Sequence, residues 1–175
     1  MKKTHKIAFS GIIVALIVSL MLSAYFPYFT YSAPAAAALL IAVLVIEIGR
    51  KWAFGAYIAS SFLTLIFCEK EAAVLYVGFF GYYIILKGII EEKFSRTIEF
   101  ILKQIIFNIA VVISYFAIEK IFGIPFDETG KTGFVFKIFM LVAGNIVFVI
   151  YDIGISRVIS GYIYKIHPKI VKMFK

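Results

Sequence analysis

Long apolar stretches without a charged residue are the feature of this sequence that most limits its possible folds. Residues 39–46 are apolar at every position, so a helix formed from them is hydrophobic on all faces. A strand of a membrane barrel would instead alternate apolar and polar residues. Helices with an apolar surface all round are buried in large proteins or cross membranes. The run therefore predicts a helix that crosses a membrane.

The composition of the whole chain agrees with this interpretation. Of the 175 residues, 63% are hydrophobic and 16% are charged, whereas a soluble domain is roughly 45–50% apolar and about 25% charged. No linker-like stretch and no internal repeat divides the sequence, so residues 1–175 are predicted to form a single domain. We predict an all-α integral membrane protein.

Spacing of the apolar segments predicts a bundle of six transmembrane helices. Each segment approaches or exceeds the roughly 20 residues that a helix needs to cross the hydrocarbon core. The segments are 7–25, 33–49, 52–68, 72–88, 98–121 and 134–160. The start of the chain resembles a signal peptide, but Leu22 occupies a position where cleavage after Ala24 needs a small residue. We expect the first helix to be retained.

The distribution of basic residues predicts that both termini are cytoplasmic. With this orientation, 14 of the 18 Lys and Arg residues lie on or near the cytoplasmic side. Lys and Arg determine orientation, and cytoplasmic loops carry an excess of them. The four on the outer side are Lys70, Lys120, Lys131 and Lys137. Because the basic residues separate apolar spans and form no basic face, the net charge of +8 does not indicate nucleic-acid binding.

Polar residues inside a span are costly, so they are candidates for function. Asn108 and Asn145 are both predicted near mid-membrane, where their side chains could meet. Two interpretations remain open: a hydrogen bond that only joins two helices, or the polar floor of a cavity that opens outward.

Further candidates surround the two asparagines. Lys137 shares a helix face with Asn145, and Tyr115 shares one with Asn108. An aromatic stripe on the fourth predicted helix contains Tyr76, Phe80 and Tyr83 and continues to Lys87. The loop of residues 25–31 is rich in Tyr and Phe, and an acidic turn lies at residues 69–71. Packing, an interfacial anchor and a solvated turn are the respective alternatives. The predicted solute contacts are Asn108, Asn145, Lys137, Tyr76, Tyr115, Glu71 and Tyr28.

Other ionisable residues have local explanations. Glu47 is expected to pair with Arg50 and Lys51, and Glu99 with Lys103, at the cytoplasmic edge. We expect no paired carboxylates in the bundle core. The two histidines lie at the cytoplasmic margins and the single cysteine is Cys68, so no enzymatic activity, metal site or cofactor is predicted.

The first predicted helix carries small residues at every fourth position, namely Gly11, Ala15, Ser19 and Ser23. Such a stripe lets another helix approach closely, either within the same chain or from a partner. With its short basic N-terminus, six predicted helices and Ala-rich entry to the second helix (residues 32–38), the chain resembles the S components of energy-coupling factor (ECF) transporters.

This resemblance implies a function and a set of partners. S components capture a vitamin-like small molecule from outside, and an Ala-xxx-Ala motif on their first helix docks on a membrane coupling subunit. Gly11, Ala15 and Ser19 correspond to this docking stripe, with Gly11 replacing the first Ala. Two cytoplasmic ATPases would supply the energy, because this sequence contains no nucleotide-binding Gly-x-x-x-x-Gly-Lys-Ser/Thr motif.

We therefore expect a multi-pass protein in the plasma membrane of a prokaryote, embedded in the lipid bilayer. The alternative that the sequence leaves open is a non-catalytic membrane scaffold of a cell-envelope complex. An ion-coupled carrier is disfavoured, because we find neither an inverted repeat nor a pair of broken helices in corresponding halves.

Overall fold

All regular secondary structure in the part of the chain that the structure describes is helical, which confirms the all-α prediction. The computed structural model describes residues 3–122 and 131–173, with side chains for 3–117 and 138–170. Each of the six predicted spans overlaps one of its helical segments. Within these described ranges, four segments are long and apolar enough to cross a membrane: Lys3–Tyr25, Lys70–Lys93, Arg96–Ala117 and Ile138–Ile170.

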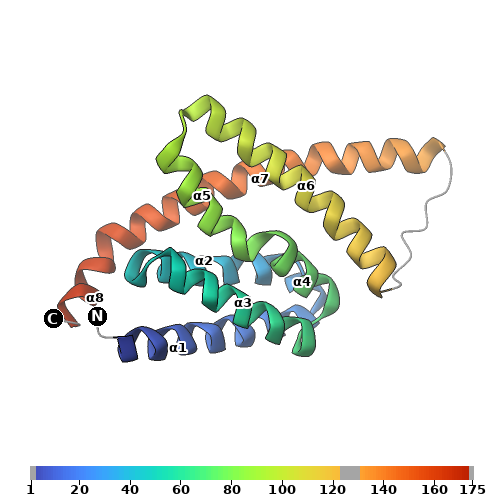
Figure 1. The fold of residues 1–175 in the computed structure, drawn as a ribbon. Helices are drawn as coiled ribbons and strands as arrows, with labels where there is room; N and C mark the ends of the chain where they lie inside the picture. The colour runs from blue at the N-terminus through green and yellow to red at the C-terminus, as the bar shows by residue number, and fades with distance from the viewer. Residues whose placement is uncertain (1–2, 123–130, 174–175) are drawn as a thin grey trace.

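Helices α1 (Lys3–Leu22), α2 (Ser32–Ile48) and α3 (Arg50–Phe67) pack against one another (Figure 1). Two short 3-10 turns, Ser23–Tyr25 and Pro27–Phe29, connect α1 to α2. Small buried side chains such as Ala37 and Ala38 let the neighbours of α2 approach it closely. The centre of the apolar core is therefore α2.

Gly49 alone separates α2 from α3. Its φ of 94° lies in the region that side chains with a Cβ rarely adopt, so a glycine is needed for this reversal. Gly49 N–H donates to the carbonyl of Leu44 at 3.1 Å, which closes the end of α2. The second and third predicted spans thus form an antiparallel pair (Figure 1).

The fourth predicted span is a helix with a π-turn inside it. It consists of α4 (Lys70–Leu75), the π-helix η3 (Tyr76–Phe80) and α5 (Gly81–Lys93). The Glu69 carboxylate caps its start by accepting from the N–H groups of Glu71 and Ala72. A π-turn contains more residues than an α-turn and so changes which residues share a face.

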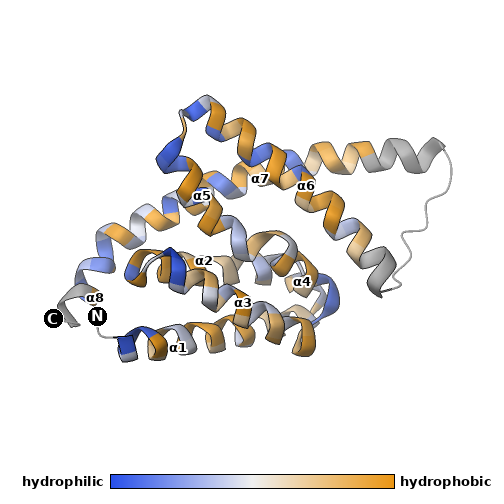
Figure 2. Cartoon of the chain, in the orientation of Figure 1, coloured by the Kyte–Doolittle hydropathy of each residue, from blue (hydrophilic) through white to orange (hydrophobic). Residues whose placement is uncertain are grey.

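Helices α6 (Arg96–Phe122) and α7 (Lys131–Lys165) are the longest, and α8 (His167–Met173) follows α7. The turn at residues 94–95 returns α6 alongside the end of α5, and α7 passes both helices (Figure 1). Hydrophilic residues gather at the start of α1, at the turn between α5 and α6 and toward the end of α7, whereas the helices between these regions are mostly hydrophobic (Figure 2).

A polar contact at the end of α2 differs from the sequence-based expectation. Glu47 accepts hydrogen bonds from Tyr162 Oη and binds His167 Nδ1, each at 2.9 Å. Arg50, its predicted partner, instead forms an ion pair with Glu92 of α5. The predicted pairing of Glu47 with Arg50 is therefore wrong, because tertiary contacts provide both groups with partners from distant helices.

Candidate functional site

Asp152 of α7 is the centre of an ionic cluster between three helices. Its carboxylate pairs with Lys87 of α5 and accepts a hydrogen bond from Lys103 of α6 at 3.0 Å. Tyr83 Oη donates to the same carboxylate at 2.6 Å. One side chain on α7 thus receives three donors from α5 and α6.

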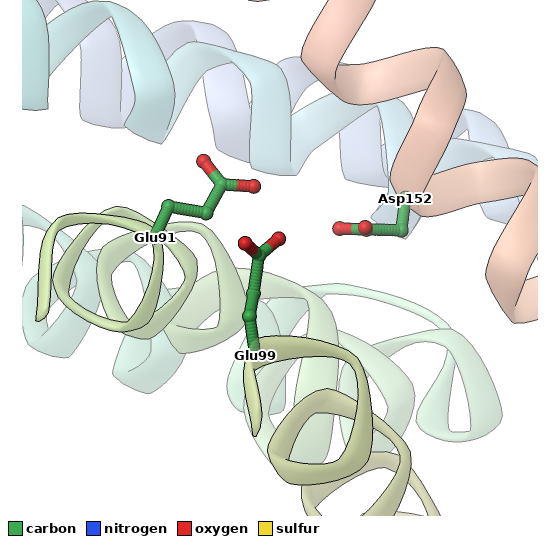
Figure 3. Close-up of side chains that lie close together, drawn as sticks. All are labelled: Glu91, Glu99 and Asp152. Carbon is green, nitrogen blue, oxygen red and sulfur yellow. The ribbon is translucent and has the colours of Figure 1, made fainter. Parts of the chain in front are cut away.

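Two further carboxylates share the lysines of this cluster. Lys103 Nζ lies 2.7 Å from Glu91 Oε1 and 2.6 Å from Glu99 Oε1, and Lys87 Nζ lies 2.6 Å from Glu91 Oε1. The predicted Glu99–Lys103 pair is confirmed. Figure 3 shows the carboxylates of Glu91, Glu99 and Asp152 close together. The sequence patterns do not predict these neighbouring carboxylates, none of which is fully buried.

Burial makes the two lysines energetically important. The side chains of Lys87 and Lys103 are only 2% and 4% exposed, whereas the three carboxylates are partly accessible. A buried ammonium group is tolerated when it is paired and hydrogen-bonded, and removal of its partners is costly. The cluster therefore holds α7 against α5 and α6.

The same three carboxylates have the spacing of a possible cation site, since one oxygen from each lies within 4.8 Å of the others. The Lys103 ammonium, however, is within 3.0 Å of all three. It already supplies the positive charge that a metal ion would bring. We assign the cluster as an ion-pair network.

An aromatic layer lies next to the ionic cluster. Phe107 and Phe148 stack with ring centroids 4.6 Å apart and planes 6° from parallel. Phe79 and Tyr83 form a second stack at 4.8 Å, and Phe79 meets both other rings edge-on. Aromatic pairs of this geometry contribute roughly 0.5–1.5 kcal/mol beyond their buried area. These rings add an apolar packing contact between α5, α6 and α7.

Asn108 and Asn145 meet, as predicted, and bond to each other in both directions. Their reciprocal Nδ2–Oδ1 distances are 2.9 and 3.0 Å. Each Nδ2 also donates to the carbonyl four residues earlier in its helix, that of Gln104 or Leu141, at 2.8 Å. All four amide hydrogens are therefore used, which leaves only oxygen lone pairs for a solute.

The other predicted solute contacts are dispersed. Tyr76 is fully buried and its hydroxyl meets Ser60 of α3 at 2.8 Å. The π-turn separates it from Tyr83 and Lys87, which face α7, so these residues do not form one stripe. Tyr115 is half-buried beside Phe116 in α6. The side chain of Lys137 lies outside the described residues.

Two predicted contacts belong to the region near the aromatic loop. Glu71 accepts from Tyr31 Oη at 2.9 Å, and Tyr25 Oη donates to the carbonyl of Phe67 at 3.1 Å. These bonds tie the loop to the turn between α3 and α4. Tyr28 is 93% exposed at the tip of the loop.

The small residues of α1 lie on its exposed face. Gly11, Ala15 and Ser19 are exposed, and a Cβ added at Gly11 would meet nothing within 4 Å among the described residues. The opposite face, with Ile13, Ile17 and Met21, is buried. Internal packing, the alternative interpretation of the stripe, therefore does not account for these three residues.

Asn145→Ala is expected to lower the free energy of unfolding by roughly 0.5–2 kcal/mol, because it leaves the Asn108 amide with one partner fewer. Unfolding titrations in mixed micelles would measure this loss. Asn108→Ala should have a similar effect, and the double variant should cost less than the sum because both changes remove one interaction. Unchanged stability with solute binding weakened five- to 150-fold would instead identify Asn145 as a direct solute contact.

Comparisons of this chain with models of known protein families, with curated proteins and with solved structures find no match.

Proposed function

We propose that this protein is the substrate-binding S component of an ECF-type importer. In this proposal it captures a vitamin-like small molecule outside a prokaryotic cell and transfers it through a membrane coupling subunit with two cytoplasmic ATPases. The observation that carries the proposal is the exposed stripe of Gly11, Ala15 and Ser19 on α1.

This stripe supports a docking role for a physical reason. Helices in a bilayer associate through close packing, and small residues at the contact bring two backbones together. Ile13, Ile17 and Met21 already anchor the other side of α1 to this chain. A helix from another subunit is the partner that the exposed side fits.

The proposed solute cavity lies in the outer half of the bundle, between the aromatic loop, the turn at Glu69–Glu71 and the Asn108–Asn145 pair. The Tyr31–Glu71 bond supports this placement because it joins the loop to the turn. Burial, together with the hydrogen bond to Glu71, raises the pKa of Tyr31 to about 12. Its hydroxyl therefore stays protonated at neutral pH and can remain the donor in this contact.

Six membrane crossings with both termini inside are part of the same proposal. In a Cys68→Ser background, Tyr28→Cys should react with an impermeant maleimide on intact cells. Lys93→Cys should react only after the membrane is permeabilised. Both positions are exposed in this chain, so burial does not explain a difference in labelling. The reverse pattern would contradict the orientation.

Gentle extraction from native membranes tests the function itself. We expect a membrane subunit and two ATPases to copurify. Denaturation of the complex should release a small molecule, which mass spectrometry would detect. Copurification of cell-envelope assembly proteins alone, with no bound solute, would favour the scaffold instead.

A further inference from the structure

An open groove of about 820 Å³ borders the ionic cluster between the start of α6 and the second half of α7. Arg96 and Arg157 line it from opposite helices. Both arginines are exposed, and neither makes an ion pair or side-chain hydrogen bond with another described residue. The groove thus presents two available guanidinium groups.

The carboxylates at the same groove do not neutralise these arginines. Glu91, Glu99 and Asp152 all bind the buried lysines. The lining of the groove carries three cations, Arg96, Lys103 and Arg157, and these three carboxylates. The buried Lys87, which pairs with Glu91 and Asp152, brings the formal charge of groove and ionic cluster together to +1. A ligand with one negative charge would balance the site, and a guanidinium is well suited to bind phosphate oxygens through paired hydrogen bonds.

Apolar side chains also line the groove. Phe100 and Ile153 line it, and 54% and 50% of their respective surfaces are exposed. Arg96 is the first residue of a membrane-compatible segment, so the groove lies where the apolar surface ends. Its occupant should therefore combine an anionic group with an apolar chain.

We propose that this groove binds an anionic phospholipid with a hydroxylated headgroup, of which phosphatidylglycerol is the simplest. Its phosphodiester carries one negative charge and lies between Arg96 and Arg157. The headgroup hydroxyls donate to the accessible oxygens of Glu91 and Glu99, and an acyl chain follows Phe100 and Ile153. Basic pockets between membrane helices bind anionic headgroups in this way.

The hydroxyl groups distinguish this ligand from other phosphate compounds. Inorganic phosphate lacks the chain that contacts Phe100 and Ile153. Phosphatidylethanolamine is zwitterionic, so its ammonium group would leave the groove with its excess positive charge. The groove offers arginines to a phosphodiester and carboxylates to neutral hydrogen-bond donors. A lipid that carries both kinds of group is therefore its best match.

Native mass spectrometry of the full-length protein in neutral detergent, titrated with dioleoyl phosphatidylglycerol, tests the proposal. Removing both charges in Arg96→Gln/Arg157→Gln should weaken binding roughly 25-fold, since each basic group contributes about fivefold. If the double variant does not fold, Arg157→Gln alone should weaken binding about fivefold. The matched control is Lys51→Gln/Lys165→Gln, which removes two exposed charges outside the groove and should bind as the wild type does.

The same titration is repeated with dioleoyl phosphatidylethanolamine, and competition is measured with inorganic phosphate. We expect weak binding of the zwitterionic lipid and no displacement by millimolar phosphate. Equal binding of both lipids would overturn the requirement for an anion. Displacement by phosphate would make this a site for a free anion. An equal loss of lipid binding in the control variant would mean that general surface charge explains the effect. Either result overturns the proposal.

Discussion

Lys103→Met is expected to lower the free energy of unfolding by about 3–5 kcal/mol, the usual cost of breaking a buried ion pair by removing one partner. Met retains an unbranched chain of similar length, so the main loss is the ammonium group. The variant would leave Glu91, Glu99 and Asp152 together with only Lys87 to balance them. Equilibrium unfolding in mixed micelles measures the change.

The pH dependence of this variant tests the electrostatic cause. Uncompensated carboxylates repel one another, and protonation removes that repulsion, so Lys103→Met should recover stability as the pH falls. Its stability should correspondingly decrease as the pH rises. The control Lys51→Met removes an exposed lysine from α3 and should change stability by no more than about 0.5 kcal/mol. A loss of less than 1 kcal/mol in Lys103→Met, or the same loss at every pH, would show that water screens the cluster.

Local patterns in the sequence predicted much of the helical structure. The six apolar segments correspond to helical regions. This was predictable because the length of an apolar segment and the hydrogen bonds of a helix both depend only on residues within that segment. The pairing of Glu99 with Lys103 was predictable for the same reason, since residues four apart lie on one side of a helix. The meeting of Asn108 and Asn145 followed from their predicted common depth.

Contacts between distant parts of the chain were harder to predict. Asp152 is 65 residues from Lys87 and 49 from Lys103, so no spacing rule joins them. The nearest signal was that Lys87, Lys103 and Asp152 are ionisable residues in apolar segments, where each needs a partner. Matching these charges across helices could have suggested the cluster, whereas the groove depends on how α6 and α7 pack.

The π-turn explains the failure of the predicted aromatic stripe. Constant α-helical periodicity places Tyr76, Tyr83 and Lys87 on one face. With η3 between them, Tyr76 turns toward Ser60 of α3 while Tyr83 and Lys87 reach Asp152. Close packing accompanies this turn: a Cβ at Gly81 would lie 2.6 Å from the ring of Tyr57. Such a fit between α3 and the π-turn cannot be read from the spacing of aromatic residues.

The contacts of this chain separate two faces that the proposed importer would use differently. On one side, α1 is anchored by Ile13, Ile17 and Met21 and exposes its small residues. On another, α5, α6 and α7 are joined by ionic, aromatic and amide contacts. A substitution on the exposed face of α1 should therefore impair docking without disturbing the contacts among the other helices.

Ala15→Trp is accordingly expected to abolish uptake while solute binding by the isolated subunit and its free energy of unfolding stay close to wild type. The indole would hold a partner helix away from the small stripe, but Ala15 is exposed in this chain, so it has room. Transport in reconstituted vesicles, binding by the purified subunit and copurification of the coupling subunit measure the three effects. Phe62→Trp is the matched control, because Phe62 is an exposed position on α3 that already carries a large ring. If Ala15→Trp lowers binding and stability together, the stripe supports the fold of this chain; if uptake is unchanged, α1 is not the docking helix.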